Sequence, residues 1–421
     1  MNNSTLYTGI ACLLLGMTSC KKDAEAPEAP PVSDLRTYDM VPVTVERIPS
    51  GYLLECKRAL SDPQAAYAQL LDTDGDPVSR IDFNNLTTTI ENITFDRQDI
   101  TITNVLPWDG STYLLCGFAI ETQHEHRIHA VVYNVDADGA ERSDPIRRFI
   151  GSGAELLRNN DLNELYRTRV LAAKSTAGDL ILAARYETEA SARILLMRIP
   201  MSTGSLAVTA EVPLSALEHR LQFLKVRPGS DQVLVGMDVA SGNEPTVLGI
   251  STWSIAEDGL TPGPAGQVGL RKATATAVEE ADGTLRITGM YDSGFDEPRT
   301  FHGSGPDPGN LSIASVQNEG GHAGISYASQ WANGAHHSTL NLFESAVLGP
   351  EAERNDRISD LKLGKLSSNG EWSDLETIVP GQGARAIGCY QTATGTVIIG
   401  ALHPFLNTDY LHTFFLKVQP E

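Results

Sequence analysis

Apolar and polar residues alternate along most of this chain in short runs that end at glycine-containing turns. In residues 100–142 an alternating segment ends at Asp109-Gly110, and an apolar run over 113–120 follows. A second apolar run over 128–135 precedes another Asp-Gly pair at 138–139. Asp-Gly between apolar runs favours a β-hairpin, because both residues tolerate the positive φ of a tight turn. The stretch therefore predicts a four-stranded antiparallel meander.

The same pattern recurs seven times along the sequence. Its marker is the glycine in the turn before each apolar second strand: Gly51, Gly110, Gly178, Gly229, Gly283, Gly334 and Gly395. Their spacing runs from 51 to 68 residues. Units of four short strands at such a period are typical of a β-propeller. Runs such as LLC, LIL, VLV and VII are apolar on both faces, as strands packed between neighbouring blades require.

We therefore predict an all-β fold, a seven-bladed β-propeller of four-stranded antiparallel blades over residues 36–421. The chain resembles seven-bladed propellers in general, without the Trp-Asp or kelch signatures. A large sandwich or two barrels are the alternatives, which the even spacing and the scarcity of helical pattern (one or two turns near 154–166) disfavour. Residues 300–305 are too rich in glycine to make a good strand.

Two further features bear on how the ring is built. Small residues that close the second-strand runs should suit crowding near the axis: Gly117, Ala183, Gly236, Gly289 and Gly400. The seventh unit ends after its third strand, over 411–418, whereas residues 36–41 precede the first unit with nothing to pair with. We predict that 36–41 supplies the missing outer strand and closes the ring, since an open edge invites aggregation.

The N-terminus carries a processing signal rather than part of the fold. Residues 6–17 are apolar but too short to span a bilayer, and Met17-Thr18-Ser19-Cys20 follows. This arrangement resembles the lipobox of bacterial lipoproteins, with an ordinary secretory signal as the alternative. The resemblance implies that 1–19 is a signal peptide and that Cys20 is acylated. Residues 20–35 then form a linker rich in Pro, Ala and Glu.

The linker begins with Lys21-Lys22-Asp23, which resembles the export tag of surface lipoproteins in bacteria with SusC/SusD-type systems. We expect an outer-membrane lipoprotein, on the cell surface in preference to the periplasmic side. The lipid is expected to be its only membrane attachment. Lys and Arg number 32 against 53 Asp and Glu, a formal charge of −21, which repels phosphate backbones and disfavours nucleic acid as a partner.

Familiar catalytic and metal motifs are incomplete. The turns at 72–76 and 136–139 begin like calcium loops, but the equivalent turns of other units lack paired carboxylates, so hairpin turns are expected. His124, His126 and His129 do not form His-Glu-x-x-His, and His336 and His337 alternate faces on a strand. We expect three cysteines to be buried as small hydrophobic residues: Cys56, Cys116 and Cys389. We predict no catalytic residue, metal or cofactor.

The polar loops between second and third strands are the predicted binding surface, because loops on a rigid scaffold usually carry binding residues. Arginines recur where the third strand begins, and they could bind carboxylates in bidentate fashion. Nearby acids could orient them or accept sugar hydroxyls, and histidines could exchange protons. The candidate residues are Glu121, His124, Arg127, Glu187, Arg193, Asp292, Arg299, Arg357, His403 and Asp409. Solvated surface loops are the alternative interpretation.

These features predict a lipid-anchored binding or scaffold protein that presents a propeller face to a glycan or an envelope protein and performs no chemistry. A polysaccharide lyase or glycosidase with Asp/Glu, His and Arg near the axis is the first alternative. A structural subunit of an outer-membrane complex is the second. Fold alone does not decide among them.

Overall fold

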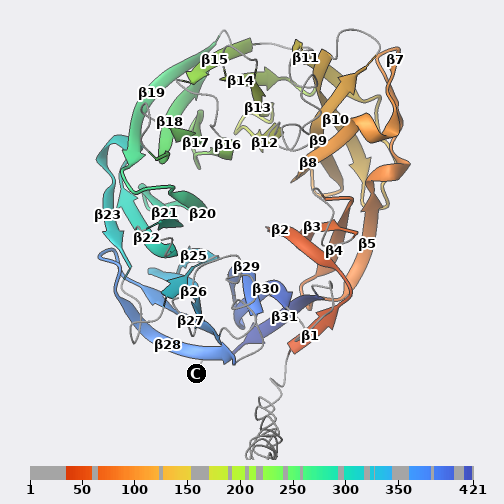
Figure 1. Ribbon diagram of the computed structural model, residues 1–421. Helices are drawn as coiled ribbons and strands as arrows, with labels where there is room; N and C mark the ends of the chain where they lie inside the picture. Colours follow the sequence, from red (N-terminus) through yellow and green to blue (C-terminus); the bar gives the residue numbers. More distant parts are fainter. Residues whose placement is uncertain are drawn as a thin grey trace, which may run out of the picture. The chain divides into compact units, whose positions relative to one another are not determined.

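The computed structural model describes most of the chain from residue 35 onward. The described ranges are 35–58, 65–122, 127–152, 170–187, 192–203, 208–214, 221–239, 245–256, 259–292, 298–316, 323–326, 328–343, 360–380, 384–402 and 412–419. Within them the strands form seven antiparallel blades arranged in a ring (Figure 1). The predicted seven-bladed β-propeller is therefore confirmed.

Each blade runs from an inner first strand to an outer fourth strand (Figure 1). Blade 1 contains β2 (Val41–Ile48), β3 (Gly51–Lys57), β4 (Tyr67–Asp72) and β5 (Pro77–Asp82). Blade 2 contains β8 (Ile100–Pro107), β9 (Thr112–Glu121), β10 (Arg127–Asp136) and β11 (Ile146–Ser152). Blade 3 contains β12 (Val170–Lys174), β13 (Leu180–Glu187), β14 (Ala192–Ile199) and β15 (Val208–Leu214).

Blades 4 to 7 complete the ring. Blade 4 contains β16 (Leu221–Val226), β17 (Gln232–Val239), β18 (Val247–Ile255) and β19 (Leu260–Val268). Blade 5 contains β20 (Thr274–Ala281), β21 (Thr284–Asp292), β22 (Pro298–Gly305) and β23 (Ser312–Ser315). Blade 6 contains β24 (Ala323–Ile325), β25 (Ser329–Ala332), β26 (Ala335–Phe343), β27 (Asp360–Leu366) and β28 (Trp372–Val379). Blade 7 contains β29 (Ala384–Thr392), β30 (Gly395–Leu402), β31 (His412–Val418) and β1 (Leu35–Tyr38).

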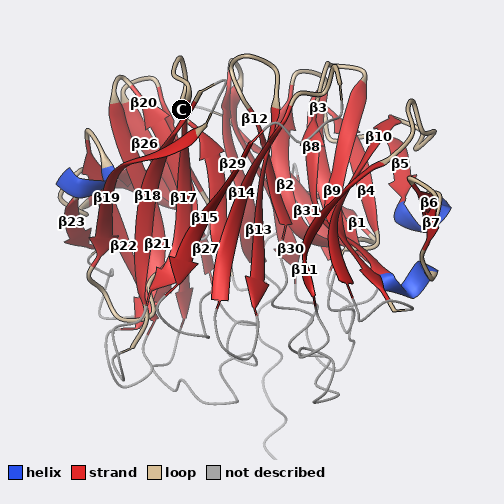
Figure 2. Ribbon diagram, turned by 90° about the horizontal axis from the view of Figure 1, so that it is seen from above, coloured by secondary structure: helices blue, strands red, loops and turns tan. Residues whose placement is uncertain are grey.

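Small elements lie outside the blades. A two-stranded hairpin of β6 (Thr89–Ile90) and β7 (Ile93–Thr94) connects blades 1 and 2. The 3₁₀ helices are η1 (Phe83–Asn85), η2 (Arg97–Asp99) and η3 (Pro308–Asn310). No helix among the described residues is long and apolar enough to cross a membrane. We call the side that carries the first-to-second and third-to-fourth strand turns the turn face (Figure 2), and the opposite side the loop face.

The N-terminal strand closes the ring, as the sequence predicted. β1 pairs antiparallel with β31, from Leu35 opposite Leu416 to Tyr38 opposite Thr413. The acidic turn between β4 and β5 reinforces this closure, because Tyr38 Oη donates to the Gly75 carbonyl (2.7 Å). Blades 7 and 1 are thus joined at this turn as well as by packing.

The carboxylates of that turn are used within the protein, in agreement with a hairpin turn rather than a calcium loop. Asp72 Oδ1 accepts from the backbone N–H groups of Asp74 and Asp76 at 2.8 and 2.9 Å. Asp74 pairs with Lys417 (2.5 Å) and Asp76 with Arg36 (2.8 Å). These exposed pairs contribute little energy, but they align the turn with β31 and β1.

Side chains from neighbouring blades bind the backbone of the inner strands. Each first strand has a strand partner on one side only. Glu55 Oε1 accepts from Val105 N–H (2.6 Å) between blades 1 and 2, and Gln222 Oε1 accepts from Ala275 N–H (2.8 Å) between blades 4 and 5. Tyr390 Oη donates to the Val45 carbonyl (2.7 Å) between blades 7 and 1. Such bonds satisfy backbone groups that would otherwise lack partners.

Glycine permits close approach to these inner strands. An added Cβ would lie 1.9 Å from Thr101 O at Gly117, 2.2 Å from Thr274 O at Gly289 and 2.1 Å from Arg385 O at Gly400. The expected crowding is confirmed at these three positions. The expectation that 300–305 makes a poor strand was wrong. It forms β22, because Gly303 and Gly305 leave room for Ile313 and Asn310 of the adjacent segment.

Among the described residues, apolar clusters fill five interfaces between neighbouring blades. They lie between blades 1 and 2, 2 and 3, 3 and 4, 4 and 5, and 7 and 1. The apolar runs of the sequence provide these clusters, since alternate residues of the second and third strands face the two neighbouring blades. Each cluster excludes water over a large apolar area, which is the main driving force for closing the ring.

We expect Gly75→Ala to destabilise the protein more than Gly110→Ala does. Both glycines have φ near +85°, but a Cβ at Gly75 would lie 2.7 Å from the Phe415 ring, whereas one at Gly110 meets nothing within 4 Å. Gly110→Ala should cost about 1 kcal/mol of backbone strain. The overlap at Gly75 should add about 1–3 kcal/mol.

Urea-induced unfolding of both variants measures this difference. Equal losses of unfolding free energy would show that the packing of this turn against β31 does not stabilise ring closure.

Candidate functional site

The predicted binding residues are only partly within the described structure. Five of the predicted residues lie outside the described structure: Cys20, His124, Arg357, His403 and Asp409. The side chains of two more, Glu187 and Arg193, also lie outside it. Glu121 and Arg127 pair across β9 and β10 at the loop face. Asp292 and Arg299 lie near the equivalent ends of β21 and β22, where Tyr291 pairs with Arg299. The loop face as a binding surface stays a prediction.

The described acids of that set contact basic groups of the protein itself. Glu121 is buried, and its Oε2 lies 3.2 Å from His129 Nε2. Asp292 Oδ2 lies 3.3 Å from Arg271 Nε and 3.5 Å from Lys272 Nζ. Arg127 is exposed at the start of β10. These acids therefore hold the strand ends together at the loop face.

The interface between blades 5 and 6 is polar, in contrast to the apolar clusters described above. Its fully buried side chains include six that carry hydroxyl or imidazole groups: Thr288, Thr300, His302, Ser326, His336 and Ser338. Ser326 Oγ and Ser338 Oγ are 2.7 Å apart, and Thr300 Oγ1 accepts from Ser326 N–H (2.8 Å). Buried polar networks are costly unless their members are paired. Departures from the apolar pattern of the other interfaces are typical of functional sites.

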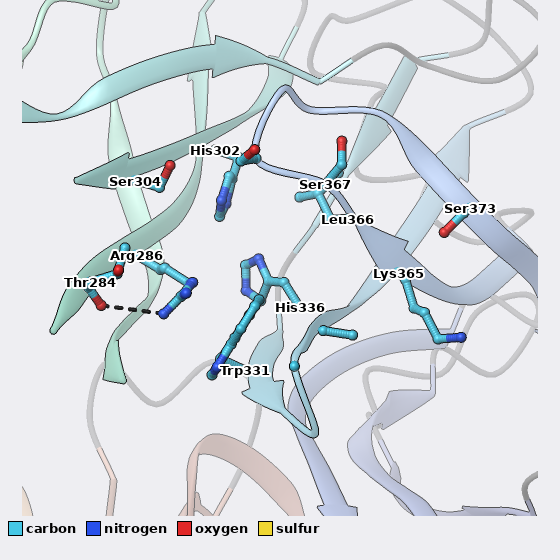
Figure 3. A pocket seen from close by; sticks show the side chains of 13 residues that line it. Thr284, Arg286, His302, Ser304, Trp331, His336, Lys365, Leu366, Ser367 and Ser373 are labelled. Carbon is cyan, nitrogen blue, oxygen red and sulfur yellow. Dashed lines mark hydrogen bonds between the residues drawn. The ribbon is translucent and has the colours of Figure 1, made fainter. Parts of the chain in front are cut away.

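A cavity of about 400 Å³ opens between these two blades (Figure 3). It lies at the turn face, because Gly334 and the turn at 367–368 form part of its wall. Its 13 lining residues are Thr284, Arg286, His302, Ser304, Trp331, Gly334, Ala335, His336, Lys365, Leu366, Ser367, Ser368 and Ser373. The volume lies in the range of small-molecule sites.

Arg286 is fixed in the wall of this cavity. Its guanidinium carbon lies 3.6 Å from the centroid of the Trp331 ring, a cation–π contact. Arg286 Nη1 donates to the carbonyls of Ala281 (3.0 Å) and Thr284 (3.3 Å) in the adjacent turn. Partial burial lowers the pKa of Arg286, yet arginine remains charged at any physiological pH. Within the described chain, no carboxylate lies at ion-pair distance from Arg286.

Two neutral histidines lie next to this cation. The His302 and His336 rings are 4.7 Å apart between centroids, and Thr288 Oγ1 lies 3.3 Å from His302 Nδ1. Burial lowers the pKa of His302 to about 4 and that of His336 to about 3, with Arg286 adding to both effects. Both imidazoles are therefore uncharged near neutral pH.

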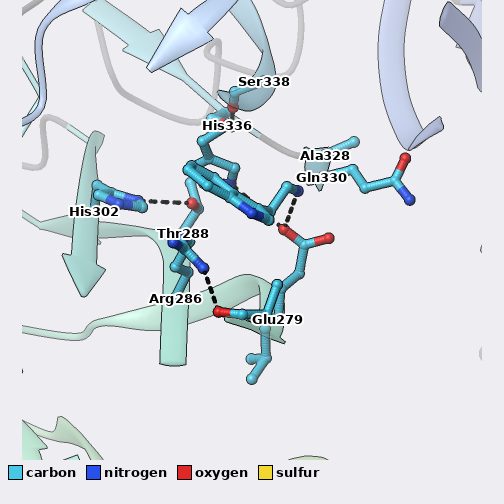
Figure 4. A network of polar contacts seen from close by, with 12 residues as sticks. Glu279, Arg286, Thr288, His302, Ala328, Gln330, His336 and Ser338 are labelled. Atoms are coloured by element: carbon cyan, nitrogen blue, oxygen red, sulfur yellow. Dashed lines mark hydrogen bonds and ion pairs between the residues drawn. The ribbon is translucent and has the colours of Figure 1, made fainter. Parts of the chain in front are cut away.

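The half-buried carboxylate of Glu279 completes the network (Figure 4). Trp331 N–H donates to Glu279 Oε2 (2.6 Å), and the same oxygen lies 3.7 Å from His336 Nε2. Burial raises the pKa of Glu279, while the Trp331 bond and the charges of Lys225 and Arg286 oppose that rise. Glu279 thus connects the inner edge of blade 6 to the wall of the cavity.

The described residues hold no group of three metal-ligating side chains. Cys56, Cys116 and Cys389 are free and buried, as expected, and burial raises the pKa of the Cys56 thiol to about 12. This keeps the Cys56 thiol protonated and unreactive. The chemistry that the blade 5–6 cavity offers is hydrogen bonding together with a fixed positive charge.

Sequence reasoning did not identify this site. In the sequence His336 is one of an adjacent histidine pair that alternates faces on a strand, and Arg286, His302 and Trp331 belong to no recognisable motif. A signal was present, because polar residues occupy LRITG (285–289) and HHSTL (336–340), where other units carry apolar runs such as LLC and VLV. Units five and six, which carry this change, are neighbours in the ring.

Comparisons with known proteins assign no family to this chain. No family model matches it, and neither does any curated protein. A structure titled polysaccharide lyase Uly1 is similar with a TM-score of 0.47 and 10% identity, covering 90% of each chain. A neuraminidase-like protein from A/bat/Guatemala/164/2009 is similar with a TM-score of 0.42 and 9% identity, over 77% of this chain and 90% of that one. Similarity at this level does not extend to function.

We expect the two histidines to make stability fall toward acidic pH. They stay neutral in the folded protein down to about pH 4 but take up protons near pH 6.5 once unfolded. Their contribution to stability is therefore complete above about pH 6.5 and is lost as the pH falls toward 4. Relative to a His302→Asn variant, the wild-type unfolding free energy should fall by about 1–3 kcal/mol between about pH 7 and 4.5.

Chemical unfolding of the two proteins at a series of pH values tests this. Glu46 and Glu279 have raised pKa values and act in the opposite direction, but both proteins share them, so the difference isolates the imidazole. Parallel curves would contradict a buried neutral His302.

Proposed function

We propose that this protein is a non-catalytic binding propeller that takes one acidic sugar residue of a glycan in the blade 5–6 cavity. The observation that carries the proposal is Arg286. It presents a fixed, charged guanidinium at the wall of a cavity lined by hydroxyl groups. Among the described residues Asp282 and Glu279 act on this charge from a distance, but neither forms an ion pair with it.

The charge of the wall supports an anionic ligand. Arg286 and Lys365 are the charged lining residues, and none of the 13 described lining residues carries a carboxylate. The chain as a whole has a formal charge of −21, so a wall without acids is unusual for this protein. Lys365 is already paired with Asp374 (2.6 Å). Arg286 is therefore the principal hydrogen-bond donor for an anionic ligand. Arginine binds carboxylates in bidentate fashion.

The remaining lining residues support a sugar. Five carry hydroxyl groups, namely Thr284, Ser304, Ser367, Ser368 and Ser373, which can both donate and accept hydrogen bonds. Trp331 adds an aromatic wall with a hydrogen-bonded indole, since its Nε1 donates to Asp282 (3.2 Å). A polyhydroxylated ring with one carboxylate matches this set of groups.

The alternative function is a polysaccharide lyase, which the proximity of Glu279 to His336 favours. A general base works best when its pKa is near the operating pH. The pKa of His336, about 3, makes it a weak base near neutral pH, so we favour binding without catalysis. Release of an ultraviolet-absorbing unsaturated sugar from a uronic acid polymer would instead establish the lyase.

We expect Arg286→Ala to weaken binding of oligogalacturonate at least tenfold, since a charged hydrogen-bonded pair is lost. The wild type should prefer oligogalacturonate to the neutral oligogalactoside. Isothermal titration with both probes measures the two effects.

Arg127→Ala and Arg299→Ala on the loop face are the matched controls and should bind like the wild type. The reverse result, with loss in these two variants and none in Arg286→Ala, would move the site to the loop face that the sequence predicted.

The lipid anchor is the second part of the proposed function. The lipobox-like sequence before Cys20 supports an outer-membrane lipoprotein, displayed on the cell surface in preference to the periplasmic side. Several acyl chains would provide stable attachment. Display of a glycan-binding propeller outside the cell fits an extracellular polymer as partner.

Replacing Cys20 with Ala should move the protein from the membrane fraction to the soluble or the uncleaved fraction. Immunoblotting of fractions after a salt wash measures this. A Cys20→Ala variant that still sediments with membranes would contradict acylation as the attachment.

A further inference from the structure

His336 lines the cavity, and its imidazole has a buried nitrogen without a hydrogen-bond partner among the described residues. The side chain of His336 is 2% exposed, and this nitrogen is Nδ1. Figure 3 shows the ring between His302 and Trp331, facing the group of lining side chains. A buried polar atom without a partner is costly, so this nitrogen requires an explanation.

The position of Glu279 determines which nitrogen carries the proton. Glu279 Oε2 lies 3.7 Å from His336 Nε2, and a carboxylate favours an N–H over a lone pair at that distance. With the proton on Nε2, the neutral ring has an unprotonated Nδ1, which can only accept a hydrogen bond. The opposite tautomer would place a lone pair against the carboxylate and leave a buried N–H without an acceptor.

We propose that Glu279 holds His336 in the Nε2–H tautomer, so that Nδ1 accepts a hydrogen bond from a ligand hydroxyl or amide N–H. Glu279 is a positioning residue, because it acts through His336. The inference rests on the proposed function, since the ligand occupies the same cavity, and it adds a second recognition element. The cavity then requires a ligand with a carboxylate for Arg286 and a donor for His336.

This pair of requirements narrows the ligand class. A simple carboxylic acid pairs with Arg286 but leaves His336 Nδ1 without a donor. A neutral sugar can donate to His336 Nδ1 but leaves Arg286 without an anion. A uronic acid carries both groups on one ring. Specificity arises because a site with a buried polar atom rejects ligands that leave that atom unpaired.

Nitrogen-15 NMR of histidine-labelled, ligand-free protein tests the tautomer directly. The His336 signals are identified by their loss in His336→Gln. We expect an Nε2–H pattern in the wild type, and a mixture of tautomers in Glu279→Gln, because an amide can either accept from Nε2 or donate to it. Asp282→Asn is the matched control. It removes a carboxylate next to Trp331 and should leave the His336 tautomer unchanged.

Binding of galacturonic acid oligomers to two substitutions tests the acceptor role. Asn places its side-chain amide near the position of Nδ1, and Gln places its amide near that of Nε2. His336→Asn should therefore retain binding better than His336→Gln, which should lose about 3- to 10-fold in affinity, the value of one hydrogen bond. A merely structural role for His336 would not separate the two variants at equal thermal stability.

The outcomes distinguish this inference from the proposed function. An Nδ1–H or charged imidazole in the wild type overturns the role of Glu279, even if acidic sugars bind through Arg286. Equal affinity of the two His336 variants overturns the acceptor role. An Nε2–H tautomer together with no binding of acidic sugars by the wild type overturns the proposed function and the ligand contact, while the positioning by Glu279 stands.

Discussion

The ring depends on hydrogen bonds that satisfy the inner edge of each blade. A first strand that faces the axis has N–H and C=O groups without a strand partner, and a buried unpaired backbone group is costly. Side chains of the neighbouring blade supply partners, as Asn104 does when its Oδ1 accepts from Ala172 N–H (2.8 Å). Gln330 does the same for Gln391 N–H (2.5 Å). Each blade thereby fixes the position of the next, and apolar packing adds the stabilising energy.

The proposed site contains one of these inter-blade contacts, the hydrogen bond between Glu279 and the Trp331 backbone. Glu279 binds Trp331 N–H as other side chains bind the inner strands elsewhere, but it also approaches His336. The first strand of blade 6 is divided into β24 and β25, which both pair with β26. Polar side chains replace the apolar cluster here, so this interface contributes less hydrophobic stabilisation. We interpret that loss as the energetic cost of a preformed cavity.

The fold could be predicted from the sequence because its signals are local and repeated. Glycine before each second strand, alternation along each strand, and the unpaired segment at 36–41 all follow from turn chemistry and strand period. The cavity could not be predicted in this way. Arg286 and His336 are 50 residues apart and meet because blades 5 and 6 are neighbours. The burial that keeps His336 neutral is likewise a property of the assembled interface. The polar loops between second and third strands favour the loop face, whereas the described cavity lies at the turn face.

Closure by β1 has a consequence for the order in which the chain folds. Leu35 of β1 and His412 of β31 are 377 residues apart in sequence. At about 5–20 residues per second, a ribosome adds β31 roughly 20–75 s after β1. Blades 1 to 6 can form in that time as an open arc, since each contains only strands that are consecutive in the chain. The pairing of β1 with β31 has a very large sequence separation, which makes it slow to form. The first strand synthesised is therefore among the last to find its partner, and the arc must be protected from association until then.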